Sequence, residues 1–193
     1  MRLIINIVLV ALIAGLAYLL YSGIAEPIAF KAEKDRRKAT VVHKLGQIRT
    51  CQEIYRDITG GFAPDFATLV STLKTERIPF RQVLEDLDFP GDPDKFIVNI
   101  TYASALDSIR AMGIELDNLS SVPFSDNARF SMSSDTTTYQ KTNVWVTETM
   151  TVWKEFMGPY ANARYMKYDD SYNPEKAIGF GSLNSPNLEG NWR

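Results

Sequence analysis

The first constraint on the fold of this chain is a run of nineteen residues, Leu3 to Tyr21, that contains no charged side chain. As an α-helix this run spans about 28 Å, close to the thickness of the hydrocarbon core of a bilayer. A backbone in lipid has to satisfy its polar groups internally, so the run has to be helical there. We therefore predict a transmembrane anchor at residues 1–25. A signal peptide cleaved near Gly23-Ile24-Ala25 is the alternative, but its apolar core would be unusually long.

Four residues of the anchor predict contact with another transmembrane helix. Ala11 and Gly15 form a small-xxx-small pair, and Ala14 lies beside them. Small residues allow two helix backbones to approach closely, and Asn6 can add a hydrogen bond between the helices. The alternative is that these residues face lipid and contact no partner.

The charges that flank the anchor do not decide its orientation. A positive-inside count alone places the rest of the chain in the cytoplasm, but long C-terminal domains are translocated largely regardless of charge. The segment FKAEKDRRK after the anchor predicts a solvated helix, with a basic collar on anionic lipid as the alternative. Before the apolar run the only charged side chain is Arg2. After it come the basic residues Lys31, Lys34, Arg36, Arg37 and Lys38 and the acidic residues Glu26, Glu33 and Asp35.

The segment after the anchor, residues 26–74, is predicted to form a helical hairpin. Pro27 predicts a break between the anchor and the next helix. From Ile28 to Asp57 apolar residues recur every three or four positions, which is the spacing of one helix face. Asp65 is suited to cap a short second helix, Phe66 to Leu73.

Residues 75–193 predict a domain with a small antiparallel sheet, because β-branched and aromatic residues alternate with polar ones there. We expect the long helix to cover the apolar face of this sheet, which makes the fold class α+β. The expected strands are Lys95–Tyr102, Ala128–Ser133 and Thr142–Thr151, with the polar loop SDTTTYQK between the last two, and the expected short helices are Arg81–Leu87 and Leu106–Met112.

The composition gives no indication of catalysis. His43 and Cys51 are the single histidine and cysteine, Cys51 falls on the apolar helix face, and no glycine-rich phosphate loop or nucleophile elbow occurs. We therefore expect a non-enzymatic protein without a cofactor or a metal. The near-neutral net charge of −2 also argues against a nucleic-acid partner. Asp86, Asp88, Asp92 and Asp94 offer clustered oxygen ligands that could hold calcium, but aspartate beside proline and glycine is typical of turns.

The last residues, Gly179 to Arg193, are rich in glycine, asparagine and serine but contain Phe180 and Trp192. Such a tail is mobile unless side chains attach it to something. We expect both aromatic side chains to insert into apolar pockets, either in the chain's own sheet or in a partner subunit, where aromatic residues are enriched.

The segment KLGQIRTCQEIYRDITGGFAPDFATLVSTLK resembles the region of type IV pilins and type II pseudopilins where an anchored helix leads into a glycine turn, an aromatic residue and a leucine-containing helix. The matching positions are Ile48, Tyr55, Gly60, Phe62 and Leu69. This resemblance implies a filament subunit.

Four further segments, EPIAFKAEKDRRKATVVHKLGQIRTCQEIYRD, ALDSIRAMGI, SVPFSDNARFSM and GSLNSPNLEGNWR, resemble a family of uncharacterised single-span envelope proteins of Gram-negative bacteria. The resemblance implies an inner-membrane anchor with the bulk of the chain in the periplasm, and it implies no activity.

Together these features predict a structural or coupling subunit of a multiprotein complex in the cell envelope, such as a secretion, pilus-like or motor-type assembly. Its partners would be other inner-membrane or periplasmic subunits and the lipid bilayer, and a homo-oligomer is left open. The alternative function is an anchored periplasmic module that binds a small ligand, calcium or cell wall.

Overall fold

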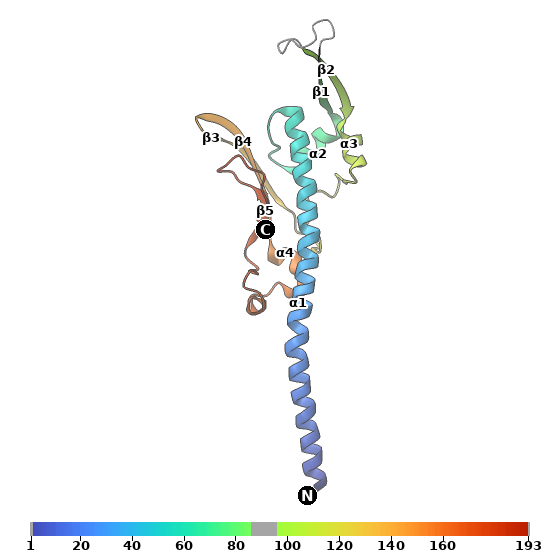
Figure 1. The fold of residues 1–193 in the computed structure, drawn as a ribbon, viewed down its shortest axis with the longest axis vertical. Helices are drawn as coiled ribbons and strands as arrows, with labels where there is room; N and C mark the ends of the chain where they lie inside the picture. The colour runs from blue at the N-terminus through green and yellow to red at the C-terminus, as the bar shows by residue number, and fades with distance from the viewer. Residues whose placement is uncertain (1, 86–95, 193) are drawn as a thin grey trace.

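One helix, α1 (Arg2–Thr59), forms the axis of the molecule (Figure 1). The computed structural model describes residues 2–85 and 96–192 of the chain. With 58 residues, α1 is about 87 Å long at 1.5 Å per residue. It continues through Pro27, so the predicted break before the second helix is wrong.

Contacts on the turn that contains Pro27 explain why α1 does not break there. Proline inside a helix removes one hydrogen bond and costs about 3 kcal/mol. Next to it, Glu26 accepts hydrogen bonds from Arg164 and Tyr168, and Phe30 one turn later is fully buried. These tertiary contacts hold the turn in helical geometry. The predicted break is based on Pro27 and its neighbours in sequence, and such a rule does not include contacts from distant residues.

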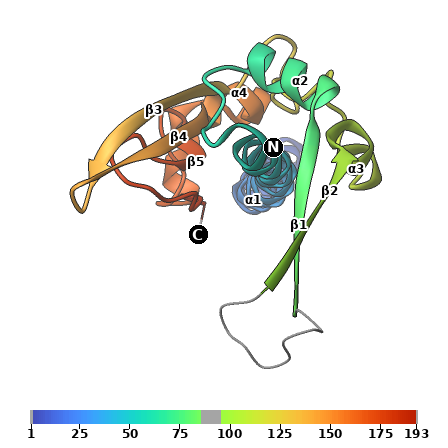
Figure 2. The same cartoon turned by 90° about the horizontal axis from the view of Figure 1, so that it is seen from above.

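Two antiparallel sheets flank α1 on opposite sides (Figure 2). The first sheet has two strands, and the second has three in the order β3-β4-β5. This arrangement confirms the α+β fold class. The further elements are α2 (Phe66–Thr75), β1 (Arg77–Glu85), β2 (Phe96–Ser104), α3 (Ala105–Ala111), β3 (Ser131–Tyr139), β4 (Thr142–Val152), α4 (Trp153–Met157), η1 (Gly158–Tyr160), η2 (Ala163–Tyr168) and β5 (Ala177–Gly181).

Within residues 26–74, α1 ends at Thr59 and α2 begins at Phe66, after the predicted cap Asp65. Gly60 follows α1 with a φ of 85°, a left-handed conformation that suits glycine. Asp65 caps α2, and its side chain accepts a hydrogen bond of 2.8 Å from the backbone N–H of Thr68. The hairpin is not a separate layer, because apolar residues of α1 and α2 belong to the same core cluster as residues of α3, α4 and β5.

Three predictions for residues 75–193 are wrong. Residues 81–85 are not helical, because they pair with β2 as part of β1. The polar loop SDTTTYQK is mostly strand β3, since its β-branched threonines suit a strand, and only Gln140 and Lys141, with φ of 48° and 68°, form the turn.

The third error is that strand β5 is not predicted. Its sequence AIGFG contains two glycines, which are unfavourable in strands. A Cβ at Gly179 or at Gly181 would lie 2.1 Å from a carbonyl oxygen of β4. The close approach of the two backbones requires glycine at both positions, and such a requirement cannot be recognised from strand propensity.

Candidate functional site: the free segment of α1 and its junction with the body

Residues 2–24 of α1, here called the free segment, project beyond every other element (Figure 1). Residues 2–21, 23 and 24 are exposed, and Ala25 is half-buried. Within the described chain, α1 is the one helix long and apolar enough to cross a membrane. Such a large exposed apolar surface is unfavourable in water and marks an interaction with lipid or protein.

The four residues predicted to pack against another helix all lie on the free segment. Ala11 and Gly15 are four residues apart and share a face, with Ala14 next to it. A Cβ at Gly15 would meet no atom within 4 Å, so this face is open. Asn6 lies nine residues before Gly15, which is two and a half turns, and therefore points to the opposite side of α1. The packing role of these residues stays a prediction, and Asn6 does not share the small-residue face.

Where the free segment ends, α1 enters a cluster of aromatic rings that we call the junction. Phe30 is fully buried and stacks on Tyr165, with ring centroids 5.1 Å apart and planes at 8°. Tyr172 meets the edge of Phe30 at 5.1 Å, and Tyr160 and Tyr168 lie within 6.3 Å. Aromatic pairs in such geometries contribute about 0.5–1.5 kcal/mol each beyond the burial of their surface. The cluster joins η1 and η2 to α1.

Two polar contacts hold η2 and the following residues on α1 at the junction. The carboxylate of Glu26 accepts hydrogen bonds from Arg164 at 3.1 Å and from the hydroxyl of Tyr168 at 2.5 Å. The buried ammonium of Lys34 forms an ion pair with Asp169. Hydrogen bonds from Lys34 and then from Ser171 lower the pKa of Asp169 to about 2.

The basic residues that follow the free segment are largely paired. Glu33 binds the guanidinium groups of Arg36 and Arg37, each at 2.6 Å, and these hydrogen bonds lower the pKa of Glu33 to about 2. Arg37 also donates a hydrogen bond of 2.6 Å to the carbonyl of Phe156 in α4. Three of the five basic side chains thus bind acidic groups of this chain. The segment is helical as predicted but solvated on one side only, because Lys31, Asp35 and Arg36 are exposed while Phe30 and Lys34 are buried.

The sequence gives weak signals for the junction. Phe30 is a single aromatic residue in a strongly charged segment, so no periodic pattern identifies it as buried. Tyr165, Tyr168 and Tyr172 are spaced by three and four residues, which is the spacing of one face. That spacing indicates a packed surface, but it does not show that the surface packs on Phe30.

Phe180 and Trp192, predicted to insert into apolar pockets, lie close together at the C-terminal tail. Phe180 in β5 is 1% exposed and belongs to the chain's own core, so its pocket is internal. Trp192 is half-buried against the same core, and the residues before it pair with β5, including Asn191 N–H to the carbonyl of Gly179 at 3.0 Å. The partner-interface role of Trp192 stays a prediction.

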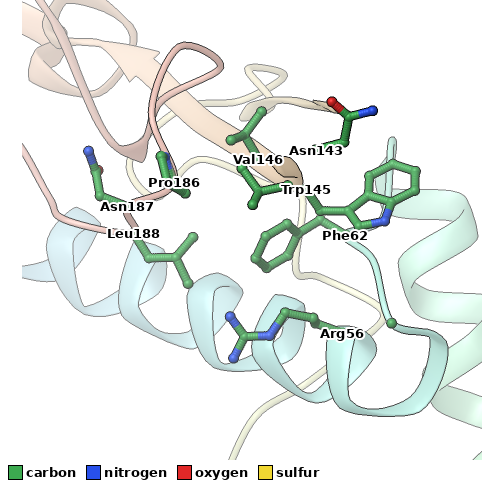
Figure 3. Close-up of a pocket in the computed structure, with 10 residues that line it drawn as sticks. Arg56, Phe62, Asn143, Trp145, Val146, Pro186, Asn187 and Leu188 are labelled. Carbon is green, nitrogen blue, oxygen red and sulfur yellow. The ribbon is translucent and has the colours of Figure 1, made fainter. Parts of the chain in front are cut away.

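A small pocket lies at the other end of the body, where α1 ends (Figure 3). Its volume is about 250 Å³, below the usual range of small-molecule sites of about 300–1,000 Å³. Trp145 is 48% exposed and packs on Gly61, and the Arg56 guanidinium lies 5.4 Å from the centre of the Phe62 ring. The other lining residues are Gly60, Asn143, Val144, Val146, Pro186, Asn187 and Leu188.

Residues that sequence reasoning considered for chemistry are not brought together. Within residues 2–85 and 96–192 no group of three or more His, Cys, Asp or Glu side chains could hold a metal ion. Cys51 is buried, and burial raises its thiol pKa to about 12, so it is a core residue. His43 is exposed on α1. The alternative calcium site, at Asp86, Asp88, Asp92 and Asp94, lies outside the described residues.

Comparisons with protein-family models, with curated proteins and with solved structures each found no match to this chain. The two resemblances to envelope proteins and to pilins therefore stay predictions.

Proposed function

We propose that this chain is a non-enzymatic, membrane-anchored structural or coupling subunit of a multiprotein complex in the cell envelope. The free segment of α1 would span the inner membrane, with the body in the periplasm. The partners would be inner-membrane or periplasmic protein subunits, and a pilus-like filament is the narrowest form of this proposal.

The observation that supports the proposal is the continuity of α1. The same helix supplies the exposed apolar segment and the buried core residues Phe30, Val41 and Leu45. No flexible linker separates the two parts, so a displacement of the span would move the body with it. A module that only binds a ligand gains nothing from a rigid connection, whereas a subunit that transmits position or force requires one.

An insertion series tests this requirement. Four residues, Gly-Ser-Gly-Ser, inserted after Gly23 would interrupt α1 near the end of the free segment, before the junction. We expect the wild-type chain to co-purify from native membranes with stoichiometric partners, and the insertion variant to stay in the membrane but lose them. The reason is that glycine and serine disfavour helix and decouple the span from the body.

The matched control is the same insertion between Gln140 and Lys141, in the turn of the β3–β4 hairpin, where added residues should be tolerated. A second control inserts seven alanines after Gly23, which lengthens α1 by almost two whole turns and keeps it helical. A wild-type chain that purifies alone, or partners that tolerate the glycine-serine insertion, would contradict the proposed coupling role.

The second candidate function is an anchored module that binds a small ligand. The pocket beside Trp145 favours it, because a half-exposed indole next to Phe62 and a guanidinium can stack on a flat or ring-shaped ligand. The pocket is small, and the rigid connection through α1 is not needed for binding. We therefore place this function second.

A further inference from the structure

We propose that the η2 surface, formed by Arg164, Met166, Lys167 and Tyr168, rests in the headgroup layer of the membrane that the free segment crosses. This inference rests on the proposed membrane anchor and adds a second membrane contact, made by a part of the chain about 140 residues away from it in sequence. The η2 surface would thus contact lipid headgroups and not another protein.

The tyrosines of the free segment mark the level of the membrane surface. Tyr18 and Tyr21 are 71% and 73% exposed and lie at the C-terminal end of the long apolar run. Tyrosine is enriched where a membrane helix leaves the hydrocarbon, because its ring is apolar and its hydroxyl is polar. The hydrocarbon boundary on this side of the bilayer therefore lies near these two residues.

The geometry of α1 then fixes the height of η2. From Tyr21 to Glu26 the helix rises about 7.5 Å, and the headgroup layer is about 5–7 Å thick on each side of the hydrocarbon. Arg164 and Tyr168 bind the Glu26 side chain at the outer limit of this layer, whereas Tyr165 stacks on Phe30, about 13.5 Å beyond Tyr21. The side of η2 that contacts Glu26 is therefore the side next to the headgroups. Figure 1 shows the orange and red part of the body, which includes α4, nearer to the free segment than α2, α3, β1 and β2.

The chemistry of the η2 surface suits such a position. Met166 is 40% exposed, although it is a large apolar side chain, and Lys167 beside it places its ammonium 4.6 Å from the centre of the Tyr168 ring. An apolar side chain flanked by a long basic one and a tyrosine can contact lipid while its polar groups stay in the headgroups. Stacking of Tyr165 on Phe30 holds this surface in place.

Basic groups at the η2 surface are paired with carboxylates of this chain, Arg164 with Glu26 and Lys34 with Asp169, so the contact does not depend on anionic lipid. A basic collar would need an excess of positive charge to attract anionic headgroups. Zwitterionic phosphatidylcholine is therefore the appropriate lipid for a test.

Nitroxide depth measurement on the full chain in phosphatidylcholine vesicles tests the inference. In a Cys51→Ala background, single labels are placed at Val10→Cys in the free segment, at Met166→Cys, and at Thr136→Cys on the distant β3 strand. Accessibility to oxygen reports lipid, and accessibility to a water-soluble nickel chelate reports solvent. In the vesicles, we expect the label at Val10→Cys to be almost inaccessible to the nickel chelate and the label at Thr136→Cys to be fully accessible. The accessibility of the label at Met166→Cys should lie between these two.

The outcomes separate this inference from the proposed function. A Met166 label as accessible to nickel as the Thr136 label, with the Val10 label in lipid, would overturn the headgroup contact and leave the anchor intact. A Val10→Cys label in solvent would overturn both the headgroup contact and the proposed membrane anchor. A second label at Lys167→Cys reads the same surface, so the result does not depend on how well one variant folds.

Discussion

Among single residues, Asp169 has the clearest energetic role, because it is the counterion of the buried Lys34. Its pKa of about 2 in the folded chain lies below the value of about 3.9 for an unfolded aspartate. A carboxylate with a depressed pKa contributes stability that is fully present above the unfolded value and is lost as pH falls through the folded value. We therefore expect part of the stability to disappear between about pH 4 and pH 2.

The variant Asp169→Asn should lower the melting temperature at pH 7, because it removes the close, largely buried counterion of the Lys34 ammonium and leaves only the exposed carboxylate of Asp35, at 3.6 Å. It should also weaken the decrease in melting temperature between about pH 4 and pH 2. Circular dichroism of the full chain in detergent measures both effects. The neighbouring exposed Asp170, changed to Asn, is the control and should change neither. Equal melting temperatures for the two variants at pH 7 would contradict the role of the Lys34–Asp169 pair.

At the scale of elements, the continuity of α1 depends on tertiary contacts around Pro27, which lies in the interior of the helix. Pro27 removes the hydrogen bond that its N–H would otherwise donate to the carbonyl of Gly23. Pro27→Ala restores this donor, so we expect the free energy of unfolding to increase by about 1–3 kcal/mol. Chemical denaturation of the full chain measures the change.

Ile28→Ala is the matched control, because Ile28 is an exposed neighbour on the same helix and its loss should change stability little. A decrease in stability for Pro27→Ala would mean that the junction requires the geometry that proline imposes. The continuity of α1 would then depend on Pro27 itself and not on the contacts of Glu26 and Phe30.

Elements could be predicted where local pattern and tertiary structure agree. The apolar face of α1, the Asp65 cap and the strand β4 follow from periodicity and turn chemistry. The predictions fail where a long-range contact decides. The junction holds Pro27 in a helix, pairing with β4 makes a strand of the threonine-rich loop, and close backbone approach selects the glycines of β5. The exposed apolar helix could be read directly from composition, but the junction that fixes it to the body could not.

At the scale of the whole molecule, the orientation of the free segment decides on which side of the membrane the body lies. We predict that it lies in the periplasm, on the basis of the resemblance to single-span envelope proteins. The basic residues after the free segment oppose this orientation, but the positive-inside rule has less effect on long C-terminal domains. The orientation of the free segment therefore has to be measured.

Alkaline phosphatase folds to an active enzyme outside the cytoplasm, so its fusions report orientation. We expect activity when it is fused after Glu26, next to the free segment, and also when it is fused after Asp126, in an exposed loop of the body. The matched control places a reporter that is active only in the cytoplasm at the same two positions, where it should be inactive. The opposite pattern at both positions would place the body in the cytoplasm and overturn the proposed envelope function, although α1 would still connect the span rigidly to the body. Activity of alkaline phosphatase after Asp126 but not after Glu26 would mean that the chain re-enters the membrane between them, which the continuous core around α1 does not allow.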